Sequence, residues 1–183
     1  MAKKIILRVL VLLVVLVAVF AIFVAMQPND YRIERSATFS APQADVFAQV
    51  NDFRKWQEWS PWAKLDPKAT ATFEGPDSGQ GAIFKWSGDE KKVGEGQMTI
   101  TESKPSDLIR IKLDFVRPMK DTANTEFTFA PDGDKTRITW AMSGTRNFVG
   151  KAFCLIMRMD KELGGKFEEG LSNMKGQVEK TKN

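Results

Sequence analysis

Three of the five tryptophans lie within seven residues, in the stretch WQEWSPW at positions 56–62. Tryptophan has a large rigid apolar surface and one N–H donor, which suits both a hydrophobic core and the rim of a pocket for an apolar molecule. We expect Trp56 to belong to the core, because it lies on the side of a short helix that would pack inward. For Trp59 and Trp62, which flank the break at Ser60-Pro61, core packing and a place at the rim remain equal alternatives.

Any acid–base chemistry would depend on carboxylates or a tyrosine, because the chain contains no histidine. This excludes Ser-His-Asp and Cys-His catalysis and histidine metal sites. The candidates are Asp160, Glu58 and Tyr31, and Asp160 is the strongest because it interrupts an apolar helical stripe. A buried carboxylate is costly unless it is paired or protonated. We therefore favour pairing of Asp160 with a nearby Arg or Lys, or with a backbone N–H in a loop, over a role facing a ligand, and both alternatives stay open.

The elements that position these residues are visible in the hydrophobic pattern. A strand candidate at 31–39 is followed by helical patterns at 40–52 and 53–59, and from about residue 69 six segments alternate apolar and polar residues between turns. Apolar residues then recur at intervals of three and four over 149–178, which predicts one long helix. Gly164-Gly165 would bend this helix or admit a close neighbour. We predict an α+β fold in which a curved antiparallel seven-stranded sheet wraps around the C-terminal helix.

The inward side of these strands is rich in aromatic residues and methionine. Such a surface suits an adaptable apolar pocket, although dense packing is the simpler explanation for any single side chain. We expect no metal site and no cofactor. The predicted ligand-binding set is Trp59, Trp62, Phe84, Trp86, Met98, Phe115, Phe127 and Trp140, with Phe153, Met157 and Asp160 from the helix.

The N-terminal segment predicts a membrane anchor. Residues 9–26 are 18 consecutive apolar positions, close to the roughly 20 that cross a bilayer. Three basic residues and no acidic residue precede them, so the positive-inside bias predicts a cytoplasmic N-terminus and a domain on the extracytoplasmic (periplasmic) side of the cytoplasmic membrane. We divide the chain into an anchor at 1–28 and a domain at 29–183. A cleaved signal peptide remains the alternative, but its apolar region is usually shorter, about 7–15 residues.

The charge and cysteine content narrow the class further. Three of the 27 basic residues precede the apolar run, so the domain is nearly balanced against 23 acidic residues. A nucleic-acid surface needs a concentrated basic face, which this pattern does not provide. The single cysteine, Cys154, cannot form an intrachain disulfide, and its apolar helical surroundings predict an inert thiol.

Several strings, in their order, carry a family resemblance, with W-x-x-W-S-P-W and F-E-x-G-L at opposite ends of the domain. They are SAPQADVFAQVNDFRKWQEWSPW (40–62), Asp66-Pro67, GPDSGQGAIFKWSG (75–88), GEGQMTI (94–100), TRITW (136–140) and MDKELGGKFEEGLSNMK (159–175). The chain resembles the START/Bet v 1-like helix-grip (SRPBCC) superfamily, in particular its bacterial polyketide cyclase/dehydrase branch with an N-terminal membrane helix. The resemblance implies a deep cavity between sheet and C-terminal helix. Families on this scaffold bind sterols, lipids, plant hormones or polyketides, and some catalyse cyclisation or dehydration.

Three functions follow as hypotheses. The first is a membrane-anchored protein that binds a hydrophobic small molecule or lipid in that cavity. The second is a cyclase or dehydratase with a carboxylate acid/base in the same cavity, which we rank lower because acid/base candidates are few. The third is an interaction or stress-related envelope protein whose filled core holds no ligand; a closed core below about 100 Å³ would favour it.

Overall fold

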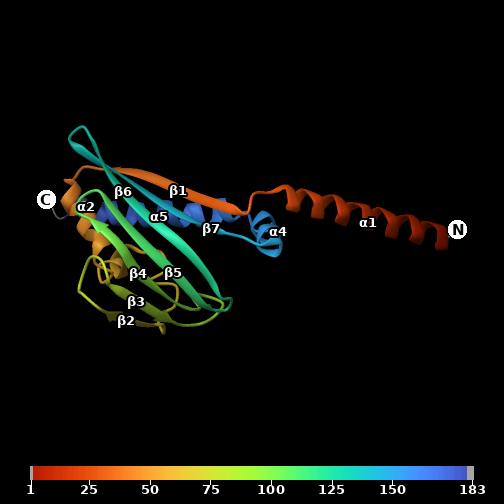
Figure 1. Cartoon of the computed structure of the whole chain (residues 1–183), viewed down its shortest axis with the longest axis horizontal. Coiled ribbons are helices and arrows are strands. Elements are labelled where there is room, and N and C mark those ends of the chain that lie inside the picture. Colours follow the sequence, from red (N-terminus) through yellow and green to blue (C-terminus); the bar gives the residue numbers. More distant parts are fainter. Residues whose placement is uncertain (1, 181–183) are drawn as a thin grey trace.

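The computed structural model describes residues 2–180 and has a curved seven-stranded antiparallel sheet with a long helix across its concave face (Figure 1). The strand order is β1-β7-β6-β5-β4-β3-β2. This confirms the predicted α+β helix-grip fold. The elements are α1 (Ala2–Met26), β1 (Asp30–Phe39), α2 (Gln43–Asn51), α3 (Trp56–Trp59), β2 (Thr70–Glu74), β3 (Ile83–Ser87), β4 (Glu95–Lys104), β5 (Leu108–Arg117), β6 (Asp121–Asp132), β7 (Lys135–Thr145), α4 (Phe148–Ile156) and α5 (Met159–Lys180).

The C-terminal part is two helices, and the prediction of one long helix over 149–178 is wrong. α4 ends at Ile156 and α5 begins at Met159, with Arg158 between them in the left-handed region at φ 49°. This change of backbone direction separates the apolar side chains of α4 from those of α5. The buried face of α5 packs into the domain through Phe167, Gly170, Leu171, Met174 and Val178.

The glycine pair does not bend α5, which continues through both positions. Instead, Gly164 admits a neighbour: a Cβ there would lie 2.1 Å from Nη2 of Arg35, whereas a Cβ on Gly165 would meet no atom within 4 Å. The guanidinium of Arg35 therefore lies directly against the backbone of α5. This contact fixes the helix along β1, the strand on which it mainly packs.

The two ends of the sheet differ in what they carry. We call the end at Asp30 of β1 and Thr145 of β7 the anchor end, because α1 reaches the domain there through residues 27–29. The antiparallel register places the β3–β4 turn (88–94) and the β5–β6 turn (118–120) at this same end. In Figure 1 α4 also lies here, beside the junction of α1 with the sheet, whereas α2 lies at the opposite end.

Within residues 2–180, α1 is the one helix long and apolar enough to cross a membrane. Nearly all of its side chains are exposed, and Val24 in its last turn is the buried exception. α1 contacts the domain through α4, where the buried Lys151 donates hydrogen bonds from Nζ to the carbonyl oxygens of Ala25 (3.3 Å) and Gln27 (2.9 Å). Because the last carbonyls of a helix have no partner within it, this ammonium group completes the end of α1.

Candidate functional site

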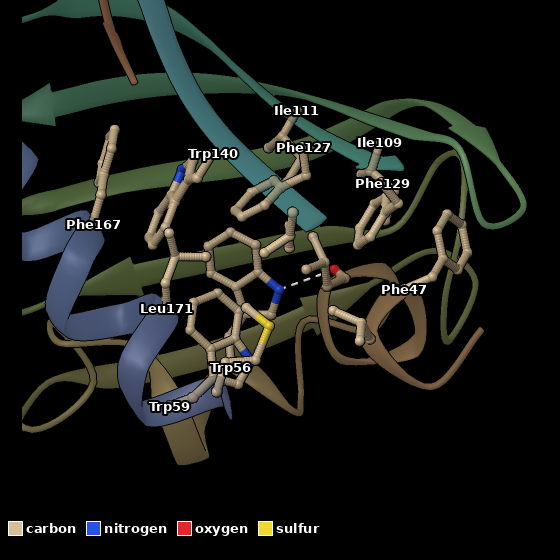
Figure 2. Close-up of a cluster of buried hydrophobic side chains, with 14 of the residues drawn as sticks. Phe47, Trp56, Trp59, Ile109, Ile111, Phe127, Phe129, Trp140, Phe167 and Leu171 are labelled. Atoms are coloured by element: carbon tan, nitrogen blue, oxygen red, sulfur yellow. Dashed lines mark hydrogen bonds between the residues drawn. The ribbon is translucent and has the colours of Figure 1, made fainter. Parts of the chain in front are cut away.

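The centre of the concave face is filled by stacked aromatic rings (Figure 2). The indole of Trp140 is sandwiched between Phe167 and Phe127, with ring centroids 4.3 and 4.9 Å away. Trp56 and Trp59 meet its edge at 6.0 and 5.7 Å. Aromatic packing at these distances adds stabilisation beyond the area that it buries. Side chains therefore occupy the space between β6, β7 and α5 where the family resemblance implies a deep cavity.

The three clustered tryptophans have different places. Trp56 is buried in the core, as predicted, and donates from Nε1 to the carbonyl oxygen of Val50. Trp59 is completely buried and donates to the carbonyl oxygen of Gln49, so the structure decides against its place at a rim. These two bonds explain the crowding, because they attach α3 to the end of α2. Trp62 is half-buried and lies edge-on to Trp140, at the boundary of the filled core.

One polar atom in this core has no hydrogen-bond partner, the indole Nε1 of Trp140. The side chain is almost completely buried, and Figure 2 shows the nitrogen on the side of the ring turned away from Trp56 and Trp59. A buried donor without an acceptor costs about 1–3 kcal/mol. Such groups are rare in native structures.

A second group of aromatic side chains on the same face is only half-buried. It consists of Phe73, Phe84, Trp86 and Phe115, which we call the aromatic ladder. Successive ring centroids along it are 5.4, 5.9 and 6.1 Å apart, so the four rings form one continuous apolar surface across β2 to β5. The part formed by Trp86 and Phe115 lies at the anchor end of the sheet.

The backbone of β4 makes room for the central ring of the ladder. A Cβ on Gly96 would lie 2.5 Å from Cζ2 of Trp86, so only glycine allows the indole to lie across the strand. The indole N–H donates to the carbonyl oxygen of Val93 in the β3–β4 turn at 2.9 Å. Trp86 is therefore held in one orientation while its face stays partly open. Met98 of β4, from the predicted set, is buried opposite Phe84 of β3. Leu113 of β5 extends the apolar surface.

The helical members of the predicted set do not face the sheet. Phe153 and Met157 are each 49% exposed, because the break at Arg158 turns α4 toward α1. The placement of Asp160 in the lining is also wrong: its side chain is 73% exposed and lies 3.3 Å from Nη2 of Arg35. The expected ion pair with a basic residue is therefore confirmed.

The remaining acid/base candidates are poorly suited to proton transfer. Glu58 is exposed on α3. Burial raises the pKa of Tyr31, whose ring lies 3.6 Å under the guanidinium of Arg146, so the phenol stays protonated near neutral pH. Burial likewise raises the pKa of Cys154, which keeps the thiol unreactive. Among residues 2–180, no group of three cysteine or acidic side chains could hold a metal ion.

Asp66 is a buried carboxylate whose hydrogen bonds hold two segments of the chain together. It accepts hydrogen bonds from the backbone N–H groups of Asp89 (2.8 Å) and Lys68 (3.2 Å), with Lys92 at 3.8 Å. These bonds, the one from Asp89 first, hold the pKa of Asp66 below its ordinary value. The carboxylate thereby joins the loop before β2 to the β3–β4 turn.

Two hollows lie outside the filled core. One, of about 220 Å³, is lined by polar side chains of β1 and β4–β7, including Arg32, Arg110 and Glu126. The other, of about 340 Å³, is an open depression at the β5–β6 turn bordered by Phe115 of the aromatic ladder. Of these two, only the second adjoins the apolar side of the sheet.

Comparison with known proteins gives one family match. The model of the family described as polyketide cyclase / dehydrase and lipid transport matches residues 30–179. None of the curated proteins compared with the chain matches it.

Similar solved structures include three of different kinds. Protein CV1439 from Chromobacterium violaceum is 17% identical, with TM-score 0.55 over 84% of this chain and 99% of its own. Ara h 8.0201 is 13% identical, with TM-score 0.58 over 81% of this chain and 97% of its own. The di-domain ARO/CYC StfQ from the steffimycin biosynthetic pathway is 12% identical, with TM-score 0.64 over 84% of this chain and 52% of its own. At these identities the likeness shows a shared fold.

Proposed function

Since this chain belongs to the polyketide cyclase / dehydrase and lipid transport family, we propose that it binds a hydrophobic small molecule or lipid. The site that we assign to this ligand is the aromatic ladder on the anchor-end half of the concave face. It differs from the cavity expected between sheet and C-terminal helix, because stacked rings occupy that space.

The observation that carries the proposal is the continuous, half-buried surface of four aromatic rings. Contiguous exposed apolar surface on a soluble domain commonly marks a site of interaction. Covering about 200 Å² of it would contribute roughly 5 kcal/mol at ~25 cal/mol per Å², before the costs of ordering the ligand. Because Gly96 and the bond to Val93 already fix Trp86, little further ordering of the protein is needed.

Residues 1–28 would hold this domain, residues 29–183, at the cytoplasmic membrane. The length and hydropathy of α1 support a span, and the basic residues before it support a cytoplasmic N-terminus with the domain on the periplasmic side. Attachment at the surface raises the local concentration of any ligand that dissolves in the bilayer.

Binding is better supported than catalysis. Asp160 and Glu58 face solvent, and the phenol of Tyr31 has a raised pKa. General acid–base catalysis needs a group within reach of the substrate and a pKa near the working pH. A cyclase or dehydratase using a carboxylate on the concave face therefore remains the lesser candidate.

The filled centre of the concave face favours one further candidate, an envelope protein that binds no small molecule. Native mass spectrometry of the full-length protein extracted in mild detergent separates the two. We expect the wild-type protein to carry an apolar adduct. The Phe115→Ala variant should lose most of it, whereas Lys112→Ala, which alters an exposed residue on the opposite side of β5, should retain it. Adduct-free protein in all three samples, also after incubation with membrane lipid extract, would refute the binding proposal.

A further inference from the structure

Apolar side chains cover the outer surface of α4. Val149 and Ile156 are 72% and 68% exposed, and the side chains of this surface are Phe148, Val149, Phe153, Ile156 and Met157. Most helices of a soluble domain bury such residues against the core. The inner side of α4 is already occupied, because Lys151 lies buried against the end of α1. The outer surface of α4 thus needs an apolar environment that the chain itself does not supply.

The position of α4 indicates what that environment is. The two hydrogen bonds from Lys151 to Ala25 and Gln27 fix α4 beside the last turn of α1. If α1 crosses a bilayer, its last turn lies at the boundary between acyl chains and headgroups, and α4 must lie at nearly the same depth. Met119, 69% exposed in the β5–β6 turn, lies at this anchor end as well.

Charged side chains border this surface at the anchor end. The basic side chains of Lys120, Arg158 and Lys161 are exposed, and so are the acidic side chains of Asp121 and Glu162, so both signs are present. Asp160, between two of the basic residues, is paired with Arg35. Apolar side chains that enter the membrane and basic side chains that remain at the headgroups are the pattern of helices that lie in the plane of a membrane.

We infer that α4 lies in the lipid–water interface of the membrane that α1 spans, as a second point of contact that turns the anchor end of the sheet toward the bilayer. This inference rests on the proposed anchoring by α1. The contact would place the open depression beside Phe115 near the lipid surface, so that a bilayer-dissolved ligand has a short path to the aromatic ladder.

The test measures the depth of single labelled positions in the full-length protein. In a Cys154→Ser background, single cysteines replace Val149 or Ile156 on α4, Val14 in the middle of α1, and Asp134 in the β6–β7 turn at the far end. Each carries an environment-sensitive fluorophore in phosphatidylcholine/phosphatidylglycerol vesicles that contain acyl-chain spin-labelled lipid. We expect the lipid quencher to act at the α4 positions at least about two-fold more strongly than at Asp134, and iodide to act more weakly there.

The outcomes separate the two proposals. Strong lipid quenching at Val14 together with iodide quenching of both α4 positions would overturn the interfacial helix and leave the anchor standing. A Val14 label that the lipid quencher does not reach would overturn the anchoring as well. If neither quencher reached the α4 labels, this surface would be covered by protein, such as a second copy of the chain, and the inference would be wrong.

Discussion

Replacing Gly170 by alanine tests whether the aromatic centre of the domain is filled. Gly170 is buried on α5, and a Cβ there would lie 2.9 Å from Cζ3 of Trp140 and 3.1 Å from Cδ of Pro61. Trp140 has little room to yield, because Phe127 and Phe167 stack on its two faces. The added methyl group must therefore force apart α5 and the ring beneath it.

The expected size follows from two opposing effects. Alanine stabilises a helix interior by about 1 kcal/mol relative to glycine, whereas an extra methyl group in a close-packed core typically costs about 1–3 kcal/mol. We expect a net loss of about 1 kcal/mol, which for a chain of this size lowers Tm by about 2–4 °C. Thermal unfolding of the full-length protein in detergent micelles, followed by the near-ultraviolet circular dichroism of the tryptophans, measures this shift.

The matched control is Gly165→Ala on the same helix, where a Cβ meets no atom within 4 Å. It should gain the helix contribution alone and raise Tm by about 2–4 °C. If Gly170→Ala raised Tm by as much as Gly165→Ala, Trp140 would have space to move. A cavity at the centre of the concave face would then be accessible, and our assignment of the ligand to the aromatic ladder would be wrong.

Two further predictions concern the anchor end. Lys151→Met leaves two carbonyl oxygens at the end of α1 without their charged donor, and hydrogen bonds of this kind contribute about 1.5–3 kcal/mol. Amide hydrogen exchange across α4 should become roughly ten-fold faster or more in this variant. The control Lys161→Met alters an exposed side chain and should leave this exchange unchanged. Equal exchange rates in the two variants would show that the bonds are unimportant. Asp66 has a lowered pKa in the folded chain, so its carboxylate stabilises the fold above its ordinary pKa of 3.8, and this contribution is lost as the pH falls through the lower folded value. Asp66→Asn should therefore reduce the urea midpoint at pH 7, and this reduction should become smaller as the pH falls below about 3.8. An equal reduction of the midpoint at pH 7 and below pH 3.8 would contradict this reasoning.

The sheet could be predicted from the sequence because its signal is local. Alternating residues such as those of β5 and β7 have one buried and one exposed side, and the turn residues between them leave only short connections. The break between α4 and α5 has no comparable signal, because Met157 and Arg158 are neither glycine nor proline. The sequence pattern of an apolar helical stripe is also the same whether the stripe packs on a sheet or faces outward.

The candidate site was less predictable, because its details depend on contacts between distant parts of the chain. Trp59 is completely buried with its N–H bonded to a carbonyl oxygen of α2, whereas Trp62 is half-buried. Asp160 faces solvent because Arg35, 125 residues earlier, lies against Gly164. The alternation along the strands that predicted Phe84, Trp86 and Phe115 on the inner side also applies to Phe73 in ATATFEG. The complete ladder could therefore have been predicted from the sequence.

The connection between α1 and β1 is only three residues long, from Gln27 to Asn29. Even fully extended, it would span roughly 10 Å. If α1 spans a membrane as we propose, a domain attached so closely cannot carry a ligand to a facing membrane. A molecule that it took from its own bilayer would then have to be returned there, consumed in place, or passed to a diffusible acceptor.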